Sequence, residues 1–99
     1  MELLEANIEA IINLCQKHKV AKLYAFGSAL NSGFNEESDV DFLVEFERHD
    51  ISDFASNYFE LQFALEDLLE REVDLIEYDA IRNPYFRDEV DETKELIYG

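Results

Sequence analysis

Hydrophobic positions along the chain follow two periods, and the changes of period mark the expected elements. Apolar residues between Leu4 and Cys15 recur every three or four positions, which is the period of a helix that packs one face on a core. This pattern predicts a first helix over about residues 2–18. A second helical run follows Ser52, the expected N-cap, and continues to Arg71. Its expected inward positions are Phe54, Tyr58, Leu61, Leu65 and Leu68.

Three segments have the shorter period of strands. Residues 22–26 are aromatic-rich and stop at Gly27, which predicts a buried strand that runs into a turn. Residues 39–46 predict the clearest strand of the chain, because side chains alternate between its two faces. One face carries Val40, Phe42, Val44 and Phe46, and the other carries Asp39, Asp41, Leu43 and Glu45. Residues 73–77 are expected to form a third, short strand.

The last expected element is a helix that begins at Asn83 and Pro84, a typical cap and first residue. It is expected to carry Phe86, Val90 and Ile97 inward. Helices and strands that alternate at these lengths predict a small α/β or α+β fold, with a mixed sheet of three to four strands flanked by helices.

Composition limits the size and the partners of this fold. Ninety-nine residues, 47% of them hydrophobic, can bury one modest core, so residues 1–99 are expected to form a single domain. Eight Lys and Arg against 24 Asp and Glu give a formal net charge of −16, which repels nucleic acid and anionic membranes and attracts basic proteins or divalent cations. In many acidic proteins such a charge does nothing beyond keeping the chain soluble.

The compartment is predicted from two features. The first apolar stretch is interrupted by Glu5, Asn7 and Glu9, so it does not have the composition of a membrane-spanning helix or of a secretion signal. The lone Cys15 lies among isoleucines and cannot form an internal disulfide, which favours a buried thiol in a reducing compartment. A soluble cytoplasmic protein is therefore expected.

Two carboxylates, Asp39 and Asp41, stand two residues apart on the clearest expected strand. Side chains at i and i+2 of a strand project from one face, with Cα atoms about 6.6 Å apart, so the two can share a cation. Magnesium is typically held by one or two carboxylates together with substrate phosphates. Taken alone, such a pair is also typical of a solvated sheet face in a chain rich in Asp.

A turn of Gly27 and Ser28 follows the buried strand directly. A residue without Cβ lets backbone N–H groups approach an anion, and the Ser28 hydroxyl adds a donor, so a phosphate can bind there. Gly-Ser turns are common in loops, so the pair alone does not indicate a phosphate site. It becomes informative because Asp39 and Asp41 follow it at a fixed spacing. Four specified residues at a fixed spacing arise by chance on the order of once in a thousand sequences of this composition.

Gly27-Ser28, ten further residues and then Asp39-Val-Asp41 resemble the signature of the DNA polymerase beta-like nucleotidyltransferases. The length of the chain and its closing segments, Asn83-Pro-Tyr-Phe-Arg87 and Leu96-Ile-Tyr-Gly99, resemble the minimal nucleotidyltransferases, antitoxin partners of HEPN-domain ribonucleases. The resemblance covers nearly the whole chain, but only the Gly-Ser and Asp-x-Asp part is specific.

The resemblance implies a third carboxylate on the next strand, and Asp74 stands at that place. It implies that Asp39, Asp41 and Asp74 hold metal, two Mg²⁺ ions being expected, that Asp74 is also the general base, and that Gly27 and Ser28 bind the triphosphate of ATP. Relatives of this kind usually carry basic residues just after Gly-Ser, whereas residues 29–32 carry none. The metal ions, or Lys22, Arg48 or Arg87, are the alternative sources of positive charge.

Three functions fit this site. The first is an adenylyltransferase that moves AMP from ATP to a hydroxyl, by resemblance a tyrosine, of a HEPN ribonuclease toxin with which it forms a hetero-oligomer. The second is a non-catalytic antitoxin that covers a basic toxin with its acidic surface, as the missing basic residues favour. The third, nucleotidyl transfer to a small molecule such as an antibiotic, requires a substrate domain for which the chain has no room.

Overall fold

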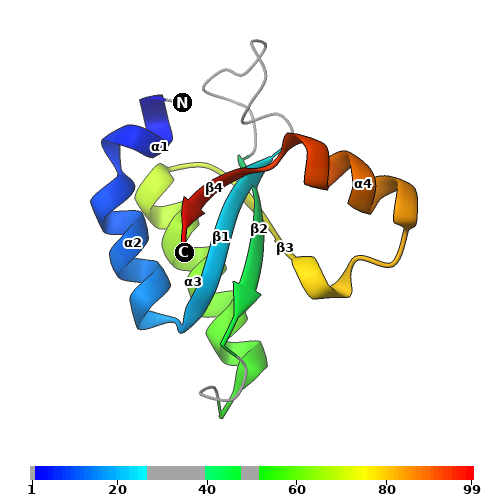
Figure 1. Ribbon diagram of the computed structural model, residues 1–99. Coiled ribbons are helices and arrows are strands. Elements are labelled where there is room, and N and C mark those ends of the chain that lie inside the picture. The colour runs from blue at the N-terminus through cyan, green and yellow to red at the C-terminus, as the bar shows by residue number, and fades with distance from the viewer. Residues whose placement is uncertain (1, 27–39, 48–51) are drawn as a thin grey trace.

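The computed structural model describes residues 2–26, 40–47 and 52–99, and its elements alternate between helices and strands (Figure 1). In chain order they are α1 (Glu2–Ala6), α2 (Ile8–Lys17), β1 (Val20–Phe26), β2 (Val40–Phe46), α3 (Phe54–Leu69), β3 (Val73–Glu77), the 3₁₀ turn η3 (Tyr78–Ala80), α4 (Pro84–Thr93) and β4 (Glu95–Tyr98). The expected mixed sheet flanked by helices is confirmed. In these ranges no helix is long and apolar enough to cross a membrane.

The four strands form one open sheet in the order β3-β2-β1-β4. Strand β1 is antiparallel to both β2 and β4, whereas β2 and β3 are parallel. Parallel neighbours need a long crossover, and α3 supplies it between β2 and β3. Figure 1 shows α2 and α3 on one side of the sheet, and α4 beyond its other side.

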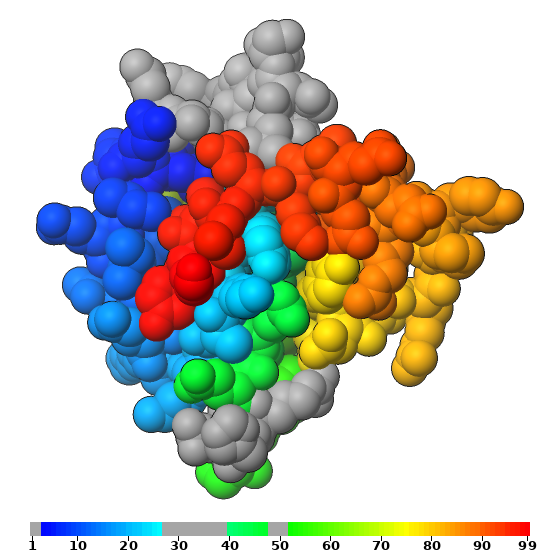
Figure 2. Space-filling model, in the orientation of Figure 1, coloured from blue at the N-terminus to red at the C-terminus, as the bar shows by residue number. Residues whose placement is uncertain are grey.

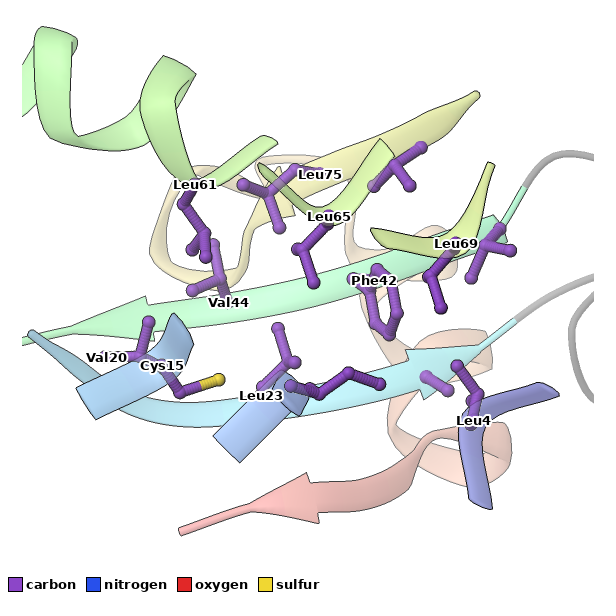
Figure 3. Close-up of a cluster of buried hydrophobic side chains, with 14 of the residues drawn as sticks. Leu4, Cys15, Val20, Leu23, Phe42, Val44, Leu61, Leu65, Leu69 and Leu75 are labelled. Atoms are coloured by element: carbon purple, nitrogen blue, oxygen red, sulfur yellow. The ribbon is translucent and has the colours of Figure 1, made fainter. Parts of the chain in front are cut away.

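The main core fills the space between the sheet and helices α1 to α3. Figure 3 shows the leucines of α3, spaced four residues apart at Leu61, Leu65 and Leu69, pointing toward Phe42 and Val44 of β2. Burying a large aliphatic or aromatic side chain of this kind contributes about 1.5–3 kcal/mol each. The expected burial of Cys15 is confirmed, and desolvation raises the pKa of its thiol to about 12. The thiol is therefore protonated at neutral pH and packs as a small hydrophobe.

A second cluster covers the opposite face of the sheet. It consists of the buried residues Phe26, Leu43, Ile81 and Val90, with Phe86 packed against them. The rings of Phe26 and Phe86 meet edge to face, with centroids 6.1 Å apart. Because both faces of β2 are covered at its centre, Phe42-Leu43-Val44 is fully buried and uniformly apolar, as is usual in strands covered on two sides.

The expected helix over residues 2–18 is wrong in one respect, because it divides at Asn7 into α1 and α2. The Asn7 side-chain amide donates to the carbonyl of Leu3 at 2.8 Å, and its backbone N–H donates to the carbonyl of Leu4 at 3.2 Å. Short amide side chains compete in this way with the helical hydrogen bonds of the backbone. The local break follows from that competition.

Two further expectations need correction, and one is confirmed. Asp53, and not Ser52, caps α3, because its carboxylate accepts from the N–H of Ser56 at 3.2 Å and from the hydroxyl of the same residue at 2.8 Å. Ile97 lies in β4 and not in the last helix, which ends at Thr93. Asn83 does cap α4, since its side-chain oxygen accepts from two N–H groups of the first turn.

The end of α3 offers a test of backbone strain. Glu70 occupies the left-handed region (φ 56°, ψ 42°), which a side chain with a Cβ disfavours, and its carboxylate stands at the negative end of the helix dipole. Glu70→Gly is therefore expected to raise the free energy of unfolding by about 0.5–1 kcal/mol, as measured by urea denaturation. Glu60→Gly, at an exposed position inside the same helix, should lower it by a similar amount. A lower midpoint for Glu70→Gly than for wild type would contradict this account.

Candidate active site

Asp41 and Asp74 stand side by side on the two parallel strands of the sheet. Asp41 of β2 is the register partner of Asp74 of β3. Register partners of adjacent strands project from the same face, and neighbouring strands lie about 4.8 Å apart, so the two carboxylates are close enough to share a cation. The topology thus places the two residues on neighbouring strands, although they come from segments separated by the whole of α3.

The alternation of each strand determines which face the carboxylates occupy. Asp41 lies between Val40 and Phe42, both of them fully buried in the core under α1 to α3. Asp74 likewise lies between two buried residues of that core, Val73 and Leu75. Both carboxylates therefore point to the opposite face, where α4 packs, and there Asp41 is half-buried while Asp74 is exposed.

The end of β1 lies beside this pair, so that Phe26, Asp41 and Asp74 form a row across three strands, which we call the carboxylate row. Phe26, the last residue of β1, is the register partner of Asp41 on its other side. Gly27 and Ser28 follow Phe26 in the sequence, but these two residues and Asp39 lie outside the described residues. Their expected roles in phosphate and metal binding remain predictions, whereas the strand end that leads to them lies beside one of the carboxylates.

The donor chemistry of the described pair fits a hard divalent cation. Asp41 and Asp74 offer only carboxylate oxygens, which is the ligand type that magnesium prefers. Among the residues that the structure describes, no three His, Cys, Asp or Glu side chains gather as a metal site. The pair alone is a partial ligand set, and the third expected ligand, Asp39, is the residue before Val40 in the sequence.

Two cations from α4 and its end, Arg87 and Lys94, bring positive charge to this face. The Arg87 guanidinium lies 4.4 Å from the ring centre of Tyr78, and the ammonium of Lys94 lies 4.7 Å from the same ring and 4.9 Å from that of Tyr24. Lys94 also pairs with Asp91 at 2.7 Å, and Tyr78 donates to that carboxylate. The hydrogen bonds from Lys94 and Tyr78 lower the pKa of Asp91.

Most of this cluster was not predicted from the sequence. Of the cations expected to supply positive charge, Arg87 lies in the cluster, Lys22 is exposed on β1, and Arg48 is outside the described residues. Lys94 and the two tyrosines come from three elements distant in the chain, so spacing along the sequence could not group them. The one available signal was the (i, i+3) pair of Asp91 and Lys94, which is common on helices.

A groove of about 640 Å³ lies next to the carboxylates without including them. It runs between the first turns of α3, the last residues of β3 and the start of α4, and its lining is mainly apolar. Leu75, Ile76 and Glu77 border it, so it opens toward the end of β3 that is remote from Asp74. Figure 2 shows the α4 and η3 segments projecting beside the body of the molecule at the right. We therefore assign the candidate chemistry to the carboxylate row and not to the groove.

Comparison with protein families gives a match over residues 9–99 to the family described as "Polymerase beta, Nucleotidyltransferase". Two proteins of Methanocaldococcus jannaschii, both named "Putative protein adenylyltransferase", are each 41% identical to the chain over 85 residues. These alignments cover 86% of the chain and 82% of each relative.

Solved structures give the same fold. A minimal nucleotidyltransferase superposes with a TM-score of 0.78 at 32% identity, over 95% of this chain and 92% of its own. A toxin-antitoxin complex with AMP-PNP follows with 0.73 at 25%, over 94% of this chain and 73% of its own. A third structure is a Shewanella oneidensis complex of an MNT antitoxin with a tri-AMPylated HEPN toxin. It has a TM-score of 0.67 at 24% identity, over 96% of this chain and 71% of its own, and supports the fold alone.

Proposed function

Because the chain belongs to the polymerase beta nucleotidyltransferase family, we propose that it transfers AMP from ATP to a tyrosine hydroxyl of a HEPN-type ribonuclease toxin. In this role the protein is the antitoxin of a toxin-antitoxin pair. The observation that carries the proposal is the register of Asp41 with Asp74 on one face of the sheet, next to the strand end that leads to Gly27 and Ser28. The relatives named as protein adenylyltransferases support a protein acceptor.

The reaction is an in-line displacement at phosphorus. The acceptor oxygen forms a bond to the α-phosphorus of ATP, the bond from that phosphorus to the α-β bridging oxygen breaks, and pyrophosphate leaves with the electron pair. The Asp74 carboxylate accepts the proton of the acceptor hydroxyl, while the Ser28 hydroxyl and the N–H groups near Gly27 hold the triphosphate. Most of the catalytic effect comes from positioning and electrostatic stabilisation.

Asp39, Asp41 and Asp74 are the residues that would hold magnesium, and we expect two ions. When bound, Mg²⁺ would neutralise charge on the phosphates and favour departure of pyrophosphate. Asp41 and Asp74 place two negative charges on neighbouring strands of a chain with a formal charge of −16, and a bound divalent cation would relieve the repulsion between them. Such a cation would also provide the positive charge that residues 29–32 lack.

We assign this reaction to residues 1–99 as one minimal nucleotidyltransferase domain, acting in the cytoplasm as a hetero-oligomer with its toxin. Cys15 is a free, buried cysteine, and cysteines without disulfides are usual in a reducing compartment. The toxin-antitoxin complex with AMP-PNP, which has the same fold, supports a toxin as partner. Long-range repulsion by the acidic surface opposes direct binding of nucleic acid or of an anionic membrane.

The proposal is tested by the intact mass of a candidate HEPN ribonuclease toxin after incubation with this protein, ATP and Mg²⁺. The expected result is a mass increase equal to one or more adenylyl groups, which disappears when EDTA is added or when Asp39→Asn/Asp41→Asn replaces the wild type. Peptide mapping of the product should place the added group on a tyrosine. An unchanged mass for a toxin that is folded and active would contradict the transferase.

The absence of basic residues from positions 29–32 favours a second function, a binding antitoxin that inhibits a basic ribonuclease through its acidic surface. Such inhibition needs no ATP and weakens as salt screens the charges. Ribonuclease assays at rising salt, with and without ATP, distinguish the two functions. Inhibition that persists without ATP and disappears at high salt selects the binding antitoxin, whereas inhibition that requires ATP and survives removal of the antitoxin selects the transferase.

A further inference from the structure

One face of α3 carries three polar side chains that bond to the backbone of β3. The hydroxyl of Tyr58 donates to the carbonyl of Leu75, and the amide of Gln62 donates to the carbonyl of Val73 at 2.9 Å. The carboxylate of Glu66 accepts from the N–H of Val73 at 3.1 Å. Residues spaced by four lie on one side of a helix, so these three form a single row alongside the strand. We call Tyr58, Gln62 and Glu66 the α3 polar row.

The row covers the free edge of the sheet. Among the strands that the structure describes, β3 lies at the edge of the sheet and pairs with β2 alone. In a strand, alternate residues direct their N–H and C=O groups to the same side, so Val73 and Leu75 face outward while Asp74 faces β2. An unpaired edge normally leaves such groups to water or to another chain. Here the bonded outward groups stand immediately before and immediately after Asp74.

The leucine row of α3 gives these bonds their geometry. Leu61, Leu65 and Leu69 are buried against the sheet, and this burial fixes both the distance and the rotation of the helix. The neighbouring polar row is thereby directed over the edge of β3. Burial, together with the Asp74 carboxylate, raises the pKa of Tyr58, so its hydroxyl keeps the proton that it donates at neutral pH and above.

We propose that Gln62, at the middle of the α3 polar row, is a positioning residue that holds Asp74 in register with Asp41. The inference rests on the proposed function, because the register matters for activity only if the two carboxylates bind metal. Gln62 does not itself touch nucleotide or metal. It bonds to the peptide group that joins Val73 to Asp74, and so restrains the position from which the carboxylate projects.

The test replaces Gln62 by Met, which has a similar length and shape but no donor. Two quantities are measured without the acceptor protein: the affinity for Mn²⁺ in the presence of ATP, from the electron paramagnetic resonance signal of free Mn²⁺, and the exchange rate of the Asp74 amide, by NMR. We expect Mn²⁺ affinity to fall about tenfold, as is usual when the support of a metal ligand is removed. The Asp74 amide should exchange about fivefold faster, since one net hydrogen bond is lost.

Matched variants separate positioning from general destabilisation. Gln16→Met makes the same replacement at an exposed position of α2, and should leave both quantities unchanged. Gln62→Lys keeps a donor on a flexible stem and should recover most of the Mn²⁺ affinity. Wild-type Mn²⁺ affinity and an unchanged Asp74 exchange rate in folded Gln62→Met would overturn the inference. So would faster exchange spread evenly over the sheet with no change in Mn²⁺ affinity.

Failure of the proposed function has a different signature. If the wild type binds no Mn²⁺ with ATP, or binds it as tightly after Asp41→Asn, the carboxylate row is not a metal site. The amide exchange still reports whether Gln62 holds Asp74 in place, because it requires neither metal nor nucleotide. With the acceptor present, positioning predicts a kcat about tenfold lower at an unchanged KM for ATP.

Discussion

Asp41→Asn is expected to reduce adenylyl transfer by a hundredfold to a thousandfold while the protein remains folded. The substitution keeps the size and shape of the side chain and removes its negative charge. Asp41 faces Asp74 across the parallel strands. Catalysis should therefore fall because a bound cation would lose a carboxylate ligand and would hold the transferring phosphoryl group less firmly, and the melting temperature should stay close to that of wild type.

The measurement is kcat and KM for ATP, with the mass of the modified acceptor as readout and with Mg²⁺ varied. Since the loss acts through metal, high Mg²⁺ should restore part of the rate. Asp67→Asn, an equal change of charge at an exposed position of α3, is the matched control and should keep wild-type activity. Activity of Asp41→Asn within threefold of the control would exclude this carboxylate from the site.

Phe42→Ala is expected to lower the free energy of unfolding by about 3–5 kcal/mol. Phe42 is fully buried beneath α3, at the position that follows Asp41 in β2. Removing the ring leaves a cavity that the leucines of α3 can fill only in part, so lost burial and lost packing add. A loss of this size is a large part of the total stability of a domain of about a hundred residues, which is roughly 5–15 kcal/mol.

Urea denaturation at 25 °C measures the change. Phe63→Ala is the matched control, since it removes the same ring from an exposed position of α3 where 62% of the residue surface is accessible. It should alter the free energy of unfolding by less than about 0.5 kcal/mol. Equal losses in the two variants would mean that the packing of α3 on β2 is not the source of stability assigned to it here.

Much of this fold could be predicted from local pattern. The alternation across β2 assigned Val40, Phe42 and Val44 to the core, and the structure confirms it. The bounds of β3 and the cap at Asn83 were also recoverable, because they depend on residues close together in the chain. Ser52 and Asp53 show the limit of such signals, since neighbouring residues of equal capping propensity cannot be ranked without the geometry of the turn.

The short strand β4 could not be predicted. Its four residues follow α4 with a single residue between them, and Ile97 continues the helical spacing of Val90 closely enough to look like part of that helix. Pairing with β1 makes it a strand, and that pairing becomes available only after β1 has found its place in the sheet. Strand propensity depends in this way on the neighbours that a segment meets.

The sequence by itself determined the residue types of the site, the period of each element and the face from which Asp41 projects. Only the tertiary structure decided that Asp41 and Asp74 are register partners, that the α3 polar row bonds to the strand on either side of Asp74, and that Lys94 joins two tyrosines on the α4 face. The physical reason is the range of the forces involved. Side-chain alternation and capping act between near neighbours in the chain, whereas strand register is chosen by the joint packing of α3, β2 and β3, which no single segment encodes.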